Sequence, residues 1–264
     1  MNRAIGVMDS GVGGLTVVKE LIRQLPNEKI IYFADKKRCP YGDKSQIDVR
    51  AFTEEIALFL SAHDIKVLVL ACNTATAAAL PELREKLDIP VIGVIKPGSR
   101  SAIQMTNNQN IIVLSTKGTA ESHAYGRKIA RINRDVKVTE FACPEFVPLV
   151  ESGRYHDEKE SDRVVNEVLS SLKNHEADTV ILGCTHYPLI RNSIHKFFDY
   201  SKYIVDSGFE TAREVSAYLD FHDMLNTEKL EEHQFYINGE YKRFEETLNK
   251  WISNMKYSIE SVDM

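Results

Sequence analysis

The sequence lacks any apolar run of about 20 residues, the length that a helix needs to cross a bilayer. Residues 1–3 lead directly into a short predicted strand and not into the apolar core of a signal peptide. Low-complexity segments are absent too, and 43% of the 264 residues are hydrophobic. We therefore expect a globular protein of the cytoplasm, with no membrane partner and with a core for one large or two modest domains.

A basic stripe is also missing. The formal net charge is −5, and residues of both signs are interspersed along the chain. Proteins that bind nucleic acid or an anionic membrane surface concentrate positive charge instead. We exclude these partners and expect a small-molecule partner.

The four cysteines form no Cys-x-x-Cys pair, which argues against a zinc ribbon and a thioredoxin-like redox site. A disulfide scaffold is not expected at this chain length. We predict no metal site, and we interpret Cys39 and Cys143 as small buried residues. Cys72 and Cys184 stand apart, because each follows an apolar run and is close to a hydroxyl residue.

These two runs, residues 67–71 and 179–183, are typical of buried parallel strands. The carboxyl end of each strand would deliver its cysteine into a crevice, where such sheets bind ligands. Residues 75–87 have the composition of a helix, so Cys72 would lie just before a helix N-terminus, which favours a thiolate. We predict that both thiols are functional.

Strand and helix patterns alternate along the whole chain, which predicts an α/β fold. Because the two cysteine strands lie in separate halves, we expect two doubly wound, mostly parallel sheets that face each other across an active-site cleft. The predicted strands are residues 4–8, 29–34, 67–71, 90–95, 110–115, 136–141, 179–183, 202–205 and 234–237, and the predicted helices are residues 15–25, 45–63, 75–87 and 161–175, with others starting near 117 and 209 and one that carries Trp251.

The alternation breaks at residues 96–98 and again at residues 206–208, which we interpret as crossings between two domains. The predicted first domain comprises residues 1–96 and 207–264 and carries Cys72, and the predicted second domain comprises residues 97–206 and carries Cys184.

The turn at residues 9–14 is rich in glycine but is not a full dinucleotide motif, because Thr16 stands where the third glycine belongs. The lysine of a P-loop is missing too. The glycines would instead let the backbone approach a small anion, such as a carboxylate, at a helix N-terminus. Asp9 would then need a cationic or protonated neighbour, unless it serves only as a helix cap.

Hydroxyl and amide side chains gather at the predicted strand ends. Any one alone is more often a helix cap, but together they would line a pocket for a polar zwitterion. Two thiols in such a pocket suggest proton transfer at a carbon next to a carboxylate, with one cysteine removing the proton and the other returning it from the opposite face. These polar residues are Ser10, Asn73, Thr74, Thr76, Thr116, Thr119 and Thr185.

A thiol with an ordinary pKa of about 8.5 needs help to act as a base near neutral pH. His186, two residues after Cys184, is a candidate helper. A pyridoxal route would need a Schiff-base lysine, for which only Lys96 is a candidate, and we consider this the weaker alternative. We therefore expect no cofactor.

Several motifs resemble the cofactor-independent glutamate racemases of bacteria, in an order and spacing that agree across nearly the whole chain. They are residues 9–16 (DSGVGGLT), 40–42 (PYG), 71–76 (ACNTAT), 146–151 (FVPLVE) and 183–189 (GCTHYPL), together with Thr116, Thr119, Ser122 and Tyr125. The departures are Ala34, Cys39 and Lys96, where Gly, Val and Glu are common in the family.

The resemblance implies two α/β domains with the active site between them. Cys72 and Cys184 would be the paired bases, and Asp9 and His186 would assist them. It also implies a homodimer and production of D-glutamate for peptidoglycan. The implied substrate contacts are Ser10, Pro40, Tyr41, Gly42, Asn73, Thr74, Thr116, Thr119, Thr185 and Glu151.

Three alternatives remain open. The related aspartate racemases share the pair of cysteines, although the residues after Cys72 and Cys184 look like the glutamate branch. A binding protein would hold glutamate without exchanging its α-proton. A thiol redox protein would form a disulfide between Cys72 and Cys184 on mild oxidation.

Overall fold

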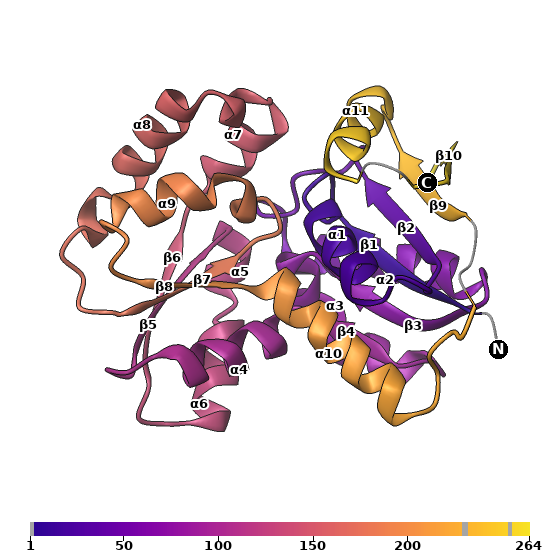
Figure 1. Cartoon of the computed structure of the whole chain (residues 1–264), viewed down its shortest axis with the longest axis horizontal. Helices are drawn as coiled ribbons and strands as arrows, with labels where there is room; N and C mark the ends of the chain where they lie inside the picture. Colours follow the sequence, from indigo (N-terminus) through magenta and orange to yellow (C-terminus); the bar gives the residue numbers. More distant parts are fainter. Residues whose placement is uncertain (1–2, 229–231, 253–254) are drawn as a thin grey trace.

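The computed structural model describes residues 3–228, 232–252 and 255–264. Within these ranges the strands form two sheets, and neighbouring strands in both sheets run parallel. The two sheets lie in separate lobes, each with helices packed against it (Figure 1). The predicted fold class of two α/β units with parallel sheets is confirmed.

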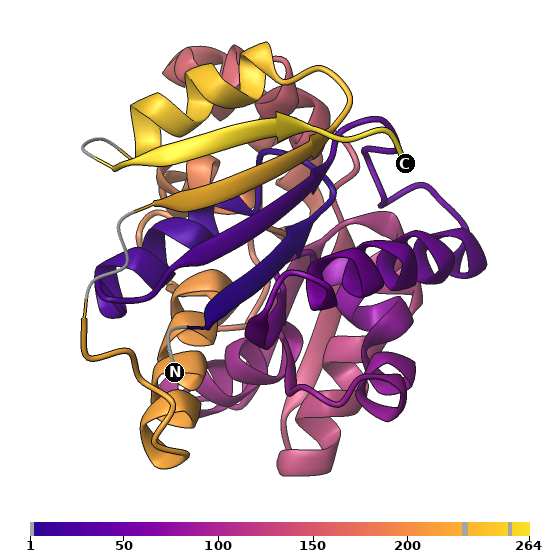
Figure 2. The same cartoon turned by 90° about the vertical axis from the view of Figure 1, so that its right-hand side faces the viewer.

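The first sheet has the strand order β10-β9-β2-β1-β3-β4. Figure 2 shows β10, β9, β2 and β1 side by side along this order. Every residue of β1, β2 and β3 is buried, because helices cover both faces, which explains their continuous apolar runs. The strands are β1 (Ala4–Asp9), β2 (Ile30–Asp35), β3 (Ile65–Leu70), β4 (Val91–Gly93), β9 (His233–Asn238) and β10 (Tyr257–Ser261).

The second sheet has the order β6-β5-β7-β8. Its central strands are buried, whereas the edge strand β6 is partly exposed along its whole length. The strands are β5 (Asn110–Ser115), β6 (Lys137–Ala142), β7 (Thr179–Gly183) and β8 (Tyr203–Asp206).

Helices connect the strands and cover the sheets. On the first sheet, Ile5 and Val7 pack with buried side chains of α1 and α10, whereas Met8 packs with those of α2 and α3, as the alternation of side chains along a strand requires. The α-helices are α1 (Leu15–Gln24), α2 (Gln46–Ser61), α3 (Asn73–Lys86), α4 (Ile95–Met105), α5 (Lys117–Glu121), α6 (Ala124–Ile132), α7 (Phe146–Glu151), α8 (Glu158–Leu169), α9 (Arg191–Phe197), α10 (Ser207–Phe221) and α11 (Lys242–Trp251), with 3-10 turns at Arg154–His156, Ser170–Leu172 and Tyr187–Ile190. None of the helices in the described ranges is long and apolar enough to span a membrane.

Residues 96–98, which we interpreted as a break in the alternation, lie inside α4 and not in a loop. Pro97 is the third residue of this helix, where the backbone N–H has no partner within the helix and proline costs little. The strand before it is therefore β4, shorter than the predicted residues 90–95. The helices α4, α7 and α9 and the strand β10 were not predicted.

The chain passes from the first sheet to the second through α4, and it returns through α10. These two helices pack against each other, and α10 also packs against α1. The division into residues 1–96 with 207–264 and residues 97–206 stays a prediction.

The topology places functional side chains at two comparable points. In the first sheet the strand order changes direction between β1 and β3, and in the second it changes between β5 and β7. Ligands of doubly wound sheets bind at the carboxyl ends of the strands at such switch points. Asp9 ends β1 and Cys72 follows β3, whereas Thr116 follows β5 and Cys184 follows β7.

Candidate active site

Cys72 is the N-cap residue of α3. Its Sγ accepts a hydrogen bond from the backbone N–H of Ala75 at 3.5 Å and lies 4.0 Å from Ser10 Oγ. The predicted position before a helix is confirmed, but the expected ease of ionisation is not. Burial and the charge of Asp9 outweigh the Ala75 N–H and raise the pKa of the Cys72 thiol to about 12. In this state Cys72 holds its proton.

Cys184 begins a chain of polar contacts that links the two lobes. Its Sγ lies 3.7 Å from Nδ1 of His186, and Nε2 of His186 lies 2.7 Å from Oε1 of Glu151. Glu151, the last residue of α7, also forms an ion pair with Lys36, which follows β2 in the first lobe. The thiol of the second lobe is therefore connected through an imidazole and a carboxylate to a cation of the first lobe.

In this series of contacts, His186 and Glu151 stabilise each other's charged forms. Burial acts to lower the pKa of His186, but the hydrogen bonds and charges of Cys184 and Glu151 outweigh it and raise the pKa to about 10. Burial acts to raise the pKa of Glu151, but His186 and Lys36 outweigh it and lower the pKa to about 2. A cationic His186 thus lies beside Cys184 Sγ at neutral pH and can donate a hydrogen bond to it.

Asp9 is fully buried and has two partners of different kinds. Its Oδ2 accepts the backbone N–H groups of Gly11 and Gly14 at 3.0 and 2.9 Å, and its Oδ1 accepts the hydroxyl of Thr185 at 3.2 Å from the other lobe. Burial raises the pKa of Asp9, opposed by the charge of His186 and by these N–H groups. Asp9 therefore both shapes its turn and contacts the segment that carries Cys184.

A cluster of three hydroxyl groups joins α3 to α5 across the two lobes. Thr74 Oγ1 lies 2.9 Å from Thr116 Oγ1 and 3.2 Å from Thr119 Oγ1, and these last two are 3.0 Å apart. Beside this cluster, Tyr125 donates a hydrogen bond to Asn73 Oδ1 at 2.7 Å. In the described part of the chain, the buried Nδ2 of Asn73 finds no acceptor. An unsatisfied buried donor of this kind is a place for a ligand oxygen.

Of residues 40–42, which the resemblance implied as substrate contacts, only Gly42 lies next to the hydroxyl cluster. Tyr41 is buried, but its hydroxyl donates to Asp35 at 2.5 Å, and Pro40 is exposed. Gly42 lies closest to the site, because its carbonyl accepts the N–H of Gly118 at 2.8 Å and a Cβ added to it would stand 2.7 Å from the Cβ of Thr116.

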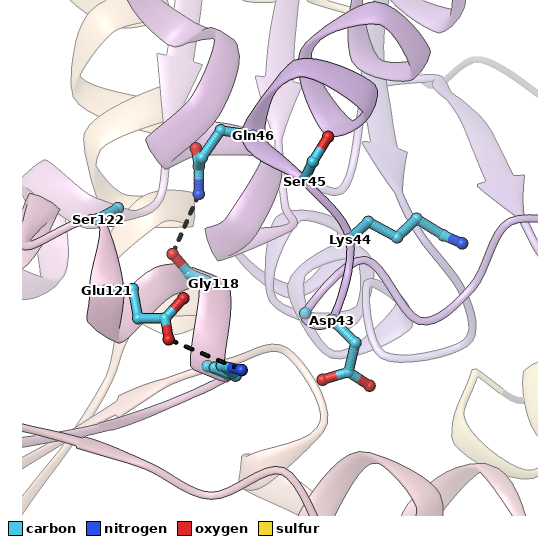
Figure 3. Close-up of a pocket in the computed structure, with 9 residues that line it drawn as sticks. Asp43, Lys44, Ser45, Gln46, Gly118, Glu121 and Ser122 are labelled. Carbon is cyan, nitrogen blue, oxygen red and sulfur yellow. Dashed lines mark hydrogen bonds and ion pairs between the residues drawn. The ribbon is translucent and has the colours of Figure 1, made fainter.

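A cavity of about 290 Å³ lies where this segment meets α5 (Figure 3). Figure 3 shows the Gln46 side chain pointing toward the carbonyl of Gly118, to which it donates a hydrogen bond of 3.1 Å. Among the described residues that line this cavity there is no cysteine. It marks the outer seam between the lobes and not the thiols themselves, each of which is only 6% exposed.

Sequence reasoning missed two residues of the site. Lys36 belongs to no recognised motif, although its place two residues after a predicted strand was a signal. Tyr32 is buried and donates its hydroxyl to the carbonyl of Gly11 at 2.8 Å, which fixes the glycine turn. Cys39, expected to be only a small buried residue, lies with its Sγ 3.9 Å from Glu151 Oε1. Cys143 fits its prediction, because it is fully buried in the core of the second lobe.

The glycine turn approaches the second lobe so closely that a methyl group does not fit at Gly13. A Cβ added there would overlap Thr185 Oγ1 and stand 2.6 Å from Nδ1 of His186. We expect Gly13→Ala to lower kcat/KM for glutamate racemisation at least about tenfold, because the added methyl group would displace Thr185 and His186. A displacement of catalytic groups by about 1 Å can lower a rate a hundredfold. Steady-state kinetics of the variant check this.

The matched control is Gly208→Ala in α10, where the added Cβ would come no closer than 3.1 Å to Val17. It should keep kcat/KM within about twofold of the unmodified protein, since ordinary helix positions tolerate alanine. Equal kcat/KM values for the Gly13 and Gly208 variants would contradict the close contact of the glycine turn with Thr185 and His186.

A sequence profile described as Asp/Glu/hydantoin racemase matches residues 5–215. The chain belongs to this racemase family. A glutamate racemase of Staphylococcus carnosus is 53% identical to this family member over 257 residues, which cover 96% of this chain and 95% of the relative.

Solved structures of the family agree in fold. A glutamate racemase isoform from Bacillus anthracis superposes with a TM-score of 0.95 at 42% identity, covering 99% of this chain and 98% of that one. The glutamate racemase of Francisella tularensis, solved in complex with D-glutamate, gives a TM-score of 0.91 at 35% identity, with coverage of 99% and 98%. This member of the racemase family is thus an isomerase, and it aligns with 98% of each of these two solved chains.

Proposed function

We propose that this protein is a cofactor-independent glutamate racemase that interconverts L- and D-glutamate. The observation that carries the proposal is the placement of Cys72 and Cys184. Each buried thiol stands at the carboxyl end of a central strand, at the switch point of its own sheet. The relatives named glutamate racemase, which align over nearly the whole chain, support the choice of substrate.

The proposed reaction needs one base on each face of the substrate α-carbon. The thiolate of one cysteine removes the α-proton, and the electron pair stays on carbon as a carbanion next to the carboxylate. The thiol of the other cysteine then gives its proton to the opposite face and becomes a thiolate. After one turnover the two cysteines have exchanged protonation states, so the reverse reaction uses the same two groups in the opposite order.

The neighbours of the two thiols differ, and so would their activation. His186 is held as a cation by Glu151, so it can stabilise negative charge on Cys184 through the 3.7 Å contact. Among the described residues, Cys72 has an N–H and a hydroxyl as hydrogen-bond partners, together with the unfavourable charge of Asp9. The ammonium group of a bound amino acid would bring positive charge and lower the pKa of the Cys72 thiol.

The substrate carboxylates would be held by neutral donors. The Nδ2 of Asn73 is an unsatisfied buried donor, and the hydroxyl cluster of Thr74, Thr116 and Thr119 can turn its protons toward an anion. We assign substrate contacts to these four residues and to Ser10, Pro40, Tyr41, Gly42, Thr185 and Glu151. Tyr41 and Pro40 are the weakest members of the set, since one binds Asp35 and the other is exposed.

The first test is proton NMR of L-glutamate with the purified protein in D2O, without pyridoxal phosphate. We expect the α-proton signal to disappear while optical rotation decays to zero, because a proton taken by a thiol exchanges with solvent. Exchange with aspartate and not with glutamate would move the assignment to aspartate racemase. If neither amino acid exchanged, the protein would be a binding relative and the proposal would be wrong.

We further propose that the product serves peptidoglycan synthesis, that the enzyme acts in the cytoplasm and that it is a homodimer. These assignments rest on the resemblance of the motifs to bacterial glutamate racemases. Light scattering of the purified protein tests the dimer, since a monomer of 30.0 kDa and its dimer differ twofold in mass.

A further inference from the structure

One ion pair joins the two lobes beside the candidate active site. Lys36 follows β2 of the first lobe, and its Nζ contacts Oε2 of Glu151, the last residue of α7 in the second lobe. The two side chains are only 16% and 17% exposed. Opposite charges that are shielded from water attract each other more strongly than exposed ones, and the removal of one leaves the other uncompensated.

Each partner of this ion pair is anchored in its own lobe. The backbone N–H of Lys37 donates to the carbonyl of Asn238 at 2.9 Å, so the segment after β2 is fastened to the end of β9. Helix α7 is anchored by apolar side chains that are buried in the core of the second lobe. The contact between Lys36 and Glu151 therefore restrains the two lobes and not merely two loops.

The hydrogen bonds that join the lobes nearby differ from this ion pair in charge. The N–H of Gly118 donates to the carbonyl of Gly42 at 2.8 Å, and the hydroxyl of Thr185 donates to Asp9 at 3.2 Å. Each of these bonds has a neutral donor, and water can replace such a donor at small cost when a seam opens. Separating Lys36 from Glu151 would instead pull two opposite charges apart.

The two oxygens of Glu151 have different partners. Oε2 contacts Lys36, whereas Oε1 lies 2.7 Å from Nε2 of His186 and accepts a longer hydrogen bond of 3.4 Å from the N–H of Val12. Because a carboxylate has lone pairs for all of these donors, the contacts do not compete. Loss of Lys36 would remove the ion pair between the lobes and leave the contact with His186 in place.

We propose that Lys36 is a positioning residue that keeps the two lobes closed on the substrate by holding Glu151. Without this ion pair, the free protein would spend more time with its lobes apart, and its apparent affinity falls in proportion to the binding-competent fraction. Once glutamate contacts both lobes, the same groups surround it and the chemical step is unchanged. The kinetic part of this inference rests on the proposed racemase function.

Lys36→Ala should raise KM for glutamate at least about threefold and leave kcat within about twofold. The alkaline limb of its pH profile of kcat/KM should not move toward neutrality. Glu151 keeps its charge beside His186, and the loss of a nearby cation does not lower the pKa of an imidazole. Initial rates over a pH series measure both quantities. A limb that moved toward neutrality, or a lower kcat with unchanged KM, would overturn the proposal.

The matched control is Lys37→Ala, which removes the neighbouring lysine. Lys37 pairs with Asp263 at 2.8 Å, but both side chains are exposed and both lie in the first lobe, so KM should stay within about twofold. Lys36→Arg can form the same ion pair with Glu151 and should also keep KM within about twofold. Equal rises in KM for the two alanine variants would refute the role of Lys36.

A double variant tests whether Lys36 acts through Glu151. In a protein that already carries Glu151→Gln, adding Lys36→Ala should change KM by less than about twofold, because the partner charge is absent. The same rise in KM with and without Glu151→Gln would show that Lys36 acts on another group, and the proposal would be wrong.

Hydrogen exchange separates this inference from the racemase assignment, because it needs no substrate. The N–H of Gly118 donates across the lobes to Gly42, whereas the N–H of Ala120 in the same helix donates to Thr116 within the second lobe. Lys36→Ala should speed exchange of the Gly118 amide at least about threefold and leave the Ala120 amide unchanged. Unchanged exchange at Gly118 would refute the proposal even in an active racemase, and faster exchange would support it even in a protein without turnover.

Discussion

Replacing either Cys72 or Cys184 by serine is expected to lower kcat for glutamate racemisation at least about a thousandfold in both directions. A hydroxyl is a much weaker acid than a thiol, so serine can neither form the base nor return the proton at a useful rate. Each turnover uses both residues, one to take a proton and one to give it. Loss of either therefore stops the reaction from L-glutamate and from D-glutamate alike. Circular dichroism assays of initial rates from each enantiomer measure this.

The matched control is Cys143→Ser. Cys143 is as deeply buried as the two proposed bases, but its Sγ lies 3.8 Å from the carbonyl of Phe141 in the core of the second lobe. Its variant should retain kcat within a few fold. Mixing the Cys72 and Cys184 variants should restore nothing, because both cysteines of one site belong to one chain. Full activity in either variant would refute the two-base assignment.

The strands of this fold could be predicted because parallel strands with both faces covered are continuous apolar runs. The core strands β1, β2, β3, β5 and β7 follow this rule, and each was predicted within two residues. Elements that depend on tertiary packing were missed. The edge strand β10 is largely exposed and pairs only with β9, so neither its composition nor its alternation distinguished it from a loop.

The start of α4 shows a different limit of sequence reasoning. Proline and glycine at residues 97 and 98 are strong signs of a turn, yet both lie in the first turn of the helix. Pro97 loses no hydrogen bond there, and the N–H of Gly98 donates to the carbonyl of Val94. Only the packing of α4 against α6 and α10 decides that the chain continues as a helix there.

The sequence predicted single residues of the candidate site, but it did not predict which of them contact each other. The motifs indicated Asp9, Cys72 and Cys184, because small polar residues after apolar strands are recognisable in one dimension. The contacts between the lobes, such as Asp9 with Thr185, join segments that no periodicity connects. The cations Arg84, Lys96 and Arg127 are a stronger case, because they lie on three different helices, α3, α4 and α6, yet line one cavity.

Replacing Glu151 by glutamine is expected to move the alkaline limb of kcat/KM by at least one pH unit toward neutrality. The unmodified protein should stay active until His186 loses its proton, near the raised pKa of about 10. Glutamine keeps a hydrogen-bonding oxygen but removes the negative charge that stabilises the imidazolium. His186 would then titrate closer to its ordinary value of about 6.5. A pH profile of kcat/KM reports the ionisation of the free enzyme and checks this directly.

The ion pair of His186 and Glu151 should also make the free energy of unfolding depend on pH in a predictable direction. His186 has a raised pKa, so its contribution to the free energy of unfolding is complete below about pH 6.5 and fades as pH rises toward 10. Glu151 has a lowered pKa, so its contribution is complete above about pH 4.5 and fades as pH falls toward 2. The pair therefore stabilises most between about pH 4.5 and 6.5, and Tm of the Glu151→Gln variant should drop most in that window.

Glu145→Gln is the matched control, because Glu145 is exposed at the other end of the same short helix. It should change neither the alkaline limb nor the pH dependence of Tm. A Glu151 variant with lower kcat but an unmoved alkaline limb would show that the carboxylate only positions groups and does not set the charge of His186. A moved limb would establish that the negative charge of Glu151, which lies far from His186 in the sequence, controls the protonation of His186 beside Cys184.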